Sequence, residues 1–328
     1  MSRQFAWGRR TVLGLLLAMA VTAVGAGEGD DYPKRPIKMI LPNAPGSSSD
    51  VLGRILAAKL GDTLGQQIVV ENHAGAGGLV GMETAKNAPS DGYTIVVATS
   101  AATSIAANLH ARLPYDPLND FQYVSTYAVV PNMLVVNPAL PVRTLQELID
   151  YSKSKQGDVF MASAGPGSQS HLAGVMLTMM GGFPAVHVPY KGGGASVLAI
   201  MSGEAQWTIT PASSVVGQAK SGKVRAIAQS LAQRTPLLPD LPPVSDTIPG
   251  YSYSGWNGII VPKATPQPIV AKLRAALLKT LALPELRELF AKQGAEVVTN
   301  TPEEFRRLVQ AEIETTGKVV KATGLKME

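Results

Sequence analysis

The sequence predicts an α/β protein made of two compact units. Short runs of β-branched and apolar residues alternate with segments in which apolar residues recur at helical spacing, and this alternation is typical of βαβ units around parallel sheets. The chain has 328 residues, so it can bury a full core without disulfide bonds. This length also favours two units over one.

The first unit begins with a strand that is followed by a loop rich in Gly and Ser. From Asp50 to Leu60 the apolar residues then fall on one stripe, as in a helix packed on a sheet. The same order of strand, small-residue loop and helix occurs a second time. We expect strands at 37–41, 67–70 and 93–98, a helix at 50–60, and a helix that runs from the glycine loop 75–78 to Lys86.

The middle of the chain repeats this pattern, and the last part adds further helices. Thr144 and Glu147 have the spacing of a capping box, and so do Thr301 and Glu304. Five prolines within 236–249 indicate an extended surface segment. We expect strands at 133–136, 159–162, 186–189, 207–210, 224–229 and 258–261, and helices after Thr144, after His171, at 268–281, at 284–292 and after Thr301.

Composition excludes several classes of function. The chain has no cysteine, which rules out thiolate nucleophiles, iron–sulfur clusters and thiolate zinc sites. No two of its four histidines have the i, i+4 spacing of a helical metal site, so we expect no metal and no cofactor. Aromatic residues make up only 5% of the chain and the basic residues are scattered, so nucleic acid is not an expected partner.

The first 26 residues have the pattern of a signal peptide. Arg3, Arg9 and Arg10 precede an apolar run at 12–24, and small residues end the segment at Ala26. Cleavage after Ala26 removes three of the 29 basic residues and none of the 24 acidic ones, which lowers the formal net charge from +5 to +2. We expect export to the periplasm by the Sec route or, because two arginines are paired, by the twin-arginine route. The alternative is that this segment is an N-terminal membrane anchor.

Four loops that follow predicted strands share one chemistry. Each is rich in glycine or hydroxyl side chains and precedes an expected helix: 43–49, 99–104, 165–170 and 192–194. Free amides at a helix N-terminus attract anions, and ligands of open α/β sheets bind at the carboxyl ends of the strands. Four such loops predict a shared anion-binding cleft.

Enzyme motifs are largely missing. The sequence has no GxxxxGK[ST] or GxSxG motif, and Val80 stands where a dinucleotide fingerprint needs glycine or alanine. His171, which follows a serine-rich loop, is the candidate histidine: it either contacts a carboxylate or hydrogen-bonds the loop backbone. Trp256 either walls the cleft or fills a junction between the units. We expect a protein that is not an enzyme, and an exported hydrolase or lyase that uses His171 and a serine is the alternative.

An ordered set of short segments extends from Tyr32 to the C-terminal part of the chain. The segments are YPKRPI at 32–37, PNAPGSSSD at 42–50, VENHAGAGG at 70–78, PSDGYT at 89–94, SQSHLA at 168–173, HVPYKG at 187–192 and TPEEF at 301–305. Through this set, the chain from Tyr32 to the C-terminus resembles the solute receptors of tripartite tricarboxylate transporters, also called Bug receptors.

The resemblance implies the fold and the function. It implies a type II, Venus-flytrap binding protein with two parallel or mixed sheets flanked by helices, in which residues 32–130 and 254–328 form lobe 1 and residues 131–253 form lobe 2. The lobes would close on a small organic anion, a mono- or dicarboxylate, which a monomeric receptor then delivers to integral-membrane permease subunits. Sequence does not separate this role from that of a sensor subunit.

Loop chemistry and the resemblance together give ten candidate ligand-binding residues. The first βα loop would hold the ligand carboxylate, and the loops of the second lobe would face it. The candidates are Asn43, Ser47, Ser48, Thr99, Ser100, Ala164, Ser168, His171, Gly193 and Thr210. Two positions depart from the family pattern: 47–49 reads Ser-Ser-Ser in place of a Gly-Gly-Ser type stretch, and Thr210 stands where aspartate is common. An aspartate there would pair with a ligand ammonium, so Thr210 disfavours amino-acid ligands.

Overall fold

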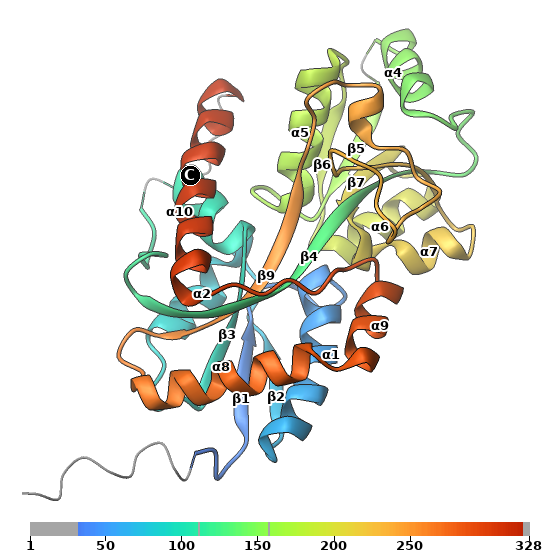
Figure 1. Cartoon of the computed structure of the whole chain (residues 1–328). Coiled ribbons are helices and arrows are strands. Elements are labelled where there is room, and N and C mark those ends of the chain that lie inside the picture. Colours follow the sequence, from blue (N-terminus) through green and yellow to red (C-terminus); the bar gives the residue numbers. More distant parts are fainter. Residues whose placement is uncertain (1–31, 111, 157, 324–328) are drawn as a thin grey trace, which may run out of the picture. The chain divides into compact units, whose positions relative to one another are not determined.

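The computed structural model describes residues 32–110, 112–156 and 158–323 (Figure 1). The predicted signal segment 1–26 lies outside the described residues. From Pro33 onward the chain forms one compact unit. None of the helices within the described ranges combines the length and the apolar character that a bilayer crossing needs.

One continuous nine-stranded sheet organises the fold. Its strands run in the order β2-β1-β3-β9-β4-β7-β5-β6, and β8 also pairs with β4. The two predicted sheets are the two ends of this sheet, and they are joined through β4. The strands are β1 (Ile37–Leu41), β2 (Ile68–Asn72), β3 (Thr94–Thr99), β4 (Phe121–Val136), β5 (Phe160–Ser163), β6 (Val186–Pro189), β7 (Trp207–Pro211), β8 (Arg225–Gln229) and β9 (Ser254–Pro262).

Two long strands connect the ends of the sheet. β4 pairs antiparallel with β9 through residues 121–131 and then with β7 through residues 132–136. The chain therefore passes from one end of the sheet to the other along β4 and returns along β9 (Figure 1). Among the named strands, β1 pairs in parallel with β2 and β3, and β5 pairs in parallel with β6 and β7.

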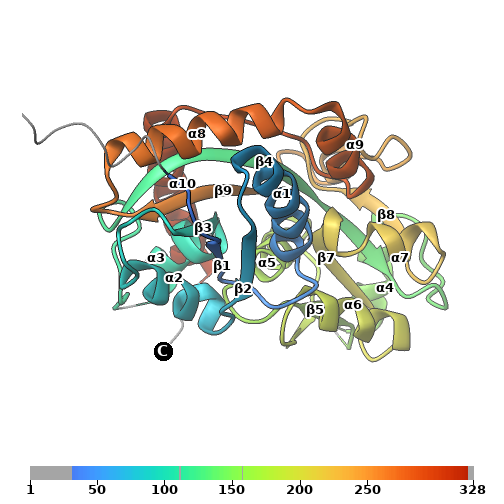
Figure 2. The ribbon, with the colours of Figure 1, turned by 90° about the horizontal axis from the view of Figure 1, so that it is seen from below.

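Helices cover both ends of the sheet. A π-helix, η2 (Ala101–Ile105), leads into α3, and α8 packs along β4 (Figure 2). The helices are α1 (Ser48–Leu64), α2 (Leu79–Lys86), α3 (Ala106–Leu109), α4 (Leu145–Ser154), α5 (Gln169–Gly181), α6 (Gly193–Ser202), α7 (Val216–Lys220), α8 (Gln267–Leu281), α9 (Pro284–Lys292) and α10 (Pro302–Thr323).

The predicted elements are present, and the largest difference lies in β4. The sequence predicts a start at 133, because polar residues before that position break the apolar pattern. In the structure the strand already begins at Phe121. Two of these polar residues are fully or almost fully buried and are satisfied from another segment: Ser125 Oγ donates to Asn300 O and Thr126 Oγ1 donates to Val298 O, both at 3.0 Å. The π-helix after Thr99 stands where a loop was expected.

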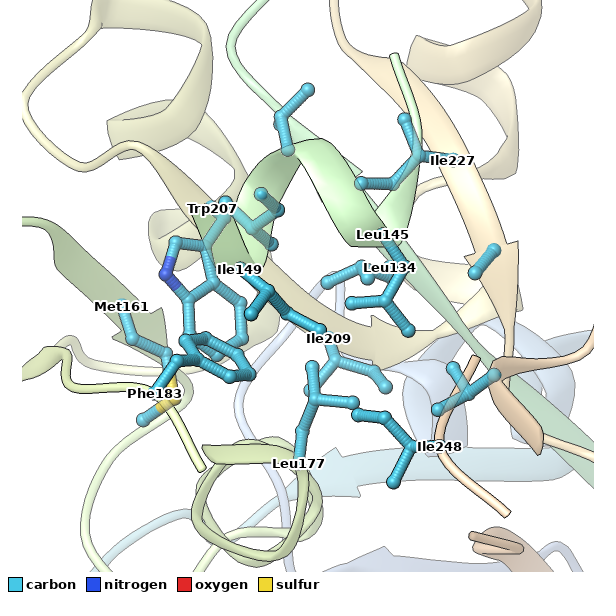
Figure 3. Packing of buried hydrophobic residues seen from close by; sticks show 14 of the residues in the cluster. Leu134, Leu145, Ile149, Met161, Leu177, Phe183, Trp207, Ile209, Ile227 and Ile248 are labelled. Carbon is cyan, nitrogen blue, oxygen red and sulfur yellow. The ribbon is translucent and has the colours of Figure 1, made fainter. Parts of the chain in front are cut away.

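Buried side chains form two main cores, one at each end of the sheet. In the first, Trp207 packs beside Phe183, with 6.0 Å between ring centroids (Figure 3). Its buried members all lie within 134–251. In the second, Trp256 and Tyr123 meet Phe305 edge to face, and the members come from 40–123 and 256–309. The division into lobes 32–130 with 254–328 and 131–253 stays a prediction.

Candidate ligand-binding site

A small pocket of about 70 Å³ lies where the carboxyl ends of strands from both ends of the sheet meet. None of the described residues that line it is charged. The lining residues are Asn43, Ser47, Ser48, Ser49, Thr99, Ala101, Val130, Ala164, Ser168, Gln169, Ser170, Gly193, Thr210, Pro211, Ser214, Gly255, Trp256 and Asn257.

Eight of the ten candidate residues line this pocket. They are Asn43, Ser47, Ser48, Thr99, Ala164, Ser168, Gly193 and Thr210. Ser100 and His171 do not line it. Both are buried, and His171 lies behind the loop that forms one wall. That these residues bind a ligand stays a prediction.

The first loop owes its shape to Asp50, a buried carboxylate in the first turn of α1. Its Oδ2 atom accepts from the Gly46 amide at 2.9 Å, and its Oδ1 atom accepts from Arg54 Nε at 2.8 Å and from Asn72 Nδ2 at 2.9 Å. Asn72 also donates to the carbonyl of Asn43 at 3.0 Å. The carboxylate of Asp50 is thus fully engaged by groups of the loop and its neighbours. The first loop therefore contributes only hydroxyl, amide and backbone groups to the pocket.

Three helices direct their N-termini at the pocket. α1 begins after Ser47, whose hydroxyl accepts from the Asp50 amide at 3.3 Å, and α5 begins after Ser168, whose hydroxyl accepts from the His171 amide at 3.2 Å. α6 begins at Gly193 with no side-chain cap. The N-terminal ends of helix dipoles carry partial positive charge, so the pocket favours an anion although none of its described lining residues is basic.

Gly192 allows the loops of the two ends of the sheet to approach each other. Its φ is +103°, and a Cβ atom placed there would lie 2.8 Å from the Cβ atom of Ala44. Any larger residue would be strained and would push the first loop away. Ser213 donates a hydrogen bond to Ser48 across the same gap. The described conformation is therefore one in which the two sides of the pocket touch.

His171 supports the second wall from behind. Its Nδ1 atom accepts from the Gly167 amide at 3.1 Å, and its ring stacks on that of His187 with centroids 4.0 Å apart. Burial, and to a lesser degree the neighbouring His187, lowers the pKa of His171 to about 4, and burial also lowers the pKa of His187. His171 is thus neutral at ordinary pH and acts as a backbone acceptor, which is the structural one of its two predicted roles.

Thr210 presents a hydroxyl that has no partner among the described residues. Its side chain is fully buried, lines the pocket, and makes no hydrogen bond through Oγ1. A buried hydroxyl without a partner is costly, and such groups in a pocket mark places where a ligand atom completes the hydrogen bonding. Thr210 is therefore the lining residue with the strongest structural reason to hydrogen-bond a ligand.

A larger chamber of about 460 Å³ adjoins the pocket. The two share Asn43, Ser47, Ala101, Ala164, Ser168 and Gly193. Its remaining walls are mainly glycine, alanine and proline from the loops at 74–78 and 165–166, and Lys191 at its edge is the one charged residue among the described lining residues. A ligand held in the inner pocket can therefore extend into this chamber.

Sequence reasoning missed several lining residues. Val130, Gly255 and Asn257 lie inside long strands, where no loop composition marks them. Ser214 follows β7 in a short helical turn, and its signal is only its place after a strand end. Gly255 has a packing role as well, because a Cβ atom there would lie 2.3 Å from the side-chain amide of Gln169.

Solved structures with the same fold are periplasmic binding proteins. The chain is 32% identical to the periplasmic binding protein BugD, with a TM-score of 0.86 over 90% of this chain and 100% of that one. The fold, together with a pocket between the two ends of the sheet, defines the protein as a periplasmic solute-binding protein.

The particular family follows from the sequence. Residues 52–325 match the family described as "Tripartite tricarboxylate transporter family receptor", and the chain belongs to this family. MatC from Rhodopseudomonas palustris, solved with bound malate, is 31% identical, with a TM-score of 0.83 over 88% of this chain and 100% of that one. A second R. palustris protein, solved with adipate, is 30% identical, with a TM-score of 0.87 over 90% and 99%. The resemblance noted in the sequence is confirmed.

Proposed function

We propose that the protein is a non-enzymatic receptor that binds a small mono- or dicarboxylate in the pocket and delivers it to integral-membrane permease subunits. The observation that carries this proposal is the convergence of three helix N-termini on a pocket whose described lining residues include no charged side chain. Helix dipoles, amides and hydroxyls stabilise an anion under these conditions, whereas they offer no counter-charge to an ammonium group.

Two relatives support the same class of ligand. One was solved with malate and the other with adipate. These two ligands are dicarboxylates that differ in length. We propose that one carboxylate of the ligand lies among the first loop and the N-termini of α5 and α6, near the unpartnered hydroxyl of Thr210. The rest of the ligand extends into the adjoining chamber, where the protein offers mostly small apolar surfaces.

Ligand capture would work by closure of two lobes. We propose 32–130 with 254–328 as lobe 1, 131–253 as lobe 2, and the crossings at 128–132 and 250–255 as hinges, because β4 and β9 leave one core and enter the other there. We further propose that residues 1–26 direct export, that the mature receptor is a monomer, and that the closed form docks on the permease.

The contacts of His171 and His187 support binding over hydrolysis. His187 Nε2 lies 2.6 Å from Ser163 Oγ, which is the distance of a nucleophile and its base. Ser163 is fully buried, however, and lies outside the pocket lining, so no substrate carbonyl can reach it. His171 has its Nδ1 atom engaged with the Gly167 amide.

A thermal-shift screen tests the proposal. Malate, adipate and short monocarboxylates should raise the melting temperature in proportion to the logarithm of their concentration, because they bind only the folded state. The amides of the same acids and neutral sugars serve as matched controls and should have no effect. Stabilisation by sugars but not by acids would overturn the proposed ligand class.

A further inference from the structure

Glu312 places a carboxylate behind one wall of the pocket. The residue belongs to α10, and its Oε2 atom accepts two hydrogen bonds, from Trp256 Nε1 at 2.8 Å and from Ser104 Oγ at 2.7 Å. The two donors belong to different elements, β9 and the π-helix η2. One oxygen atom of α10 therefore connects two elements that both reach the pocket.

The indole of Trp256 is the part of the wall that this carboxylate holds. Trp256 is 6% exposed and lines the pocket, and its neighbours Gly255 and Asn257 line it as well. A second residue of α10, Phe305, meets the same indole edge to face with 5.1 Å between ring centroids. Phe305 supports the flat ring, whereas Glu312 fixes its direction through the N–H group.

The short helix α3, which continues the π-helix, is tied to α10 by further polar contacts. Asn108 of α3 donates through Nδ2 to the Ile313 carbonyl and to Thr316 Oγ1, both at 2.8 Å, so this segment is also held about one turn further along α10. The first residue of the π-helix, Ala101, lines the pocket. π-Helical turns occur mostly at functional sites, which fits a segment whose position must be fixed.

Ser100 adds to this cluster. Its hydroxyl is buried and lies close to the Glu312 carboxylate, although no regular hydrogen bond joins the two. Burial raises the pKa of Glu312, and the hydrogen bonds from Ser104 and Trp256 act in the opposite direction. The carboxylate of this half-buried residue is thus engaged by donors from two neighbouring elements.

We propose that Glu312 is a positioning residue for the ligand site: its carboxylate fixes the indole of Trp256 against the π-helical turn and so sets the width of the pocket at this wall. The expected effect of Glu312 on affinity rests on the proposed carboxylate-binding function. The claim that Glu312 holds the indole of Trp256 in place is independent of that function, because it concerns the ligand-free protein. Without the carboxylate, the indole is free to turn and the pocket loses its shape on this side.

Tryptophan fluorescence of the ligand-free protein tests the geometry. Besides Trp256, the described residues hold only Trp207, which is fully buried in the other core, so a difference between variants reports Trp256. Glu312→Ala should shift the emission to longer wavelength and raise the acrylamide quenching constant about twofold, while Glu312→Gln, which keeps an acceptor oxygen, should restore much of the native signal. Glu314→Ala, at an exposed position of the same helix, is the control and should change neither quantity.

A double-mutant cycle with malate and adipate tests the effect on binding. Glu312→Ala and Trp256→Phe should each raise the Kd at least fivefold, and the double variant should bind no more weakly than Trp256→Phe alone, because the carboxylate acts through the indole N–H. Additive losses, or native emission in Glu312→Ala, would overturn the proposal. Failure of the native protein to bind any carboxylate would overturn the proposed function instead, and the fluorescence comparison would still decide the geometry.

Discussion

The hydroxyl of Ser213 donates a hydrogen bond to the hydroxyl of Ser48 and thereby joins the turn after β7 to the first turn of α1. Both residues are more than nine-tenths buried. They are 165 positions apart in the chain and lie on opposite sides of the pocket. This bond exists only while the two sides touch, so it favours the closed form.

Removal of that bond should therefore weaken ligand retention. A buried hydrogen bond between neutral groups contributes about 0.5–1.5 kcal/mol, which corresponds to roughly a two- to tenfold change. We expect Ser213→Ala to raise the dissociation rate of malate or adipate by this factor and to leave the association rate nearly unchanged. Stopped-flow measurements check this, with Ser221→Ala, at an exposed position, as control. An unchanged dissociation rate would mean that closure does not depend on this contact.

A negative charge at Ser48 should abolish tight binding. Ser48→Asp sets a carboxylate against the ligand's own carboxylate in a partly dry cleft. Affinity for dicarboxylates should fall at least about a hundredfold, roughly 2.7 kcal/mol, as measured by calorimetry. Circular dichroism should show a folded protein, and Ser221→Asp should bind normally. Near-native affinity in Ser48→Asp would place the anion elsewhere.

Thr210 offers a test in which stability and affinity move in opposite directions. Thr210→Val removes a buried hydroxyl that has no described partner, so the free energy of unfolding of the ligand-free protein should stay equal or rise, while carboxylate affinity falls about tenfold. The matched control is Thr208→Val on the same strand. Thr208 Oγ1 donates to Ala162 O at 2.7 Å, so this variant should lose about 1 kcal/mol of stability and keep its affinity. Equal effects of the two variants would contradict a ligand contact at Thr210.

The stacked histidines predict how stability depends on pH. The pKa of His171 is about 4 in the folded protein, below its ordinary value, so between about pH 6.5 and pH 4 the unfolded chain binds a proton that the folded chain does not. The free energy of unfolding should fall as the pH falls through this range, by up to about 3 kcal/mol from this group. Urea titrations at several pH values should show a smaller fall for His171→Gln than for the native protein. An identical pH dependence in both would contradict a neutral, buried His171.

Closure itself predicts a change in size. If the lobes move about the crossings of β4 and β9, small-angle scattering should give a smaller radius of gyration with saturating malate than without ligand. Substitution of Gly192 by valine should prevent the full decrease, because the position needs a positive φ and lies against Ala44. An unchanged radius in the native protein at saturation would argue against hinged closure.

The sequence predicts the parts of the site that depend on local chain order, and it misses those that depend on packing at a distance. Ser47 and Ser168 could be placed because a hydroxyl after a strand and before a helix has a local reason to be there. Asn257 could not, because it lies inside a strand that reaches the pocket only through its pairing with β3 and β4. Ser100 was expected in the pocket, but the unpredicted π-helix beside it places its hydroxyl near Glu312, more than two hundred residues later in the chain.

The two cores use different parts of the sequence, and this difference predicts the order in which they fold. All buried members of the core around Trp207 lie within 134–251, so this core can form as soon as that central stretch is available. The core around Trp256 needs Phe305 and Val309 from the last helix, and it stays incomplete until nearly the whole chain has emerged. During folding the central part of the sequence should therefore become resistant to proteases before its flanks do, and the pocket between the two cores should be the last feature to form.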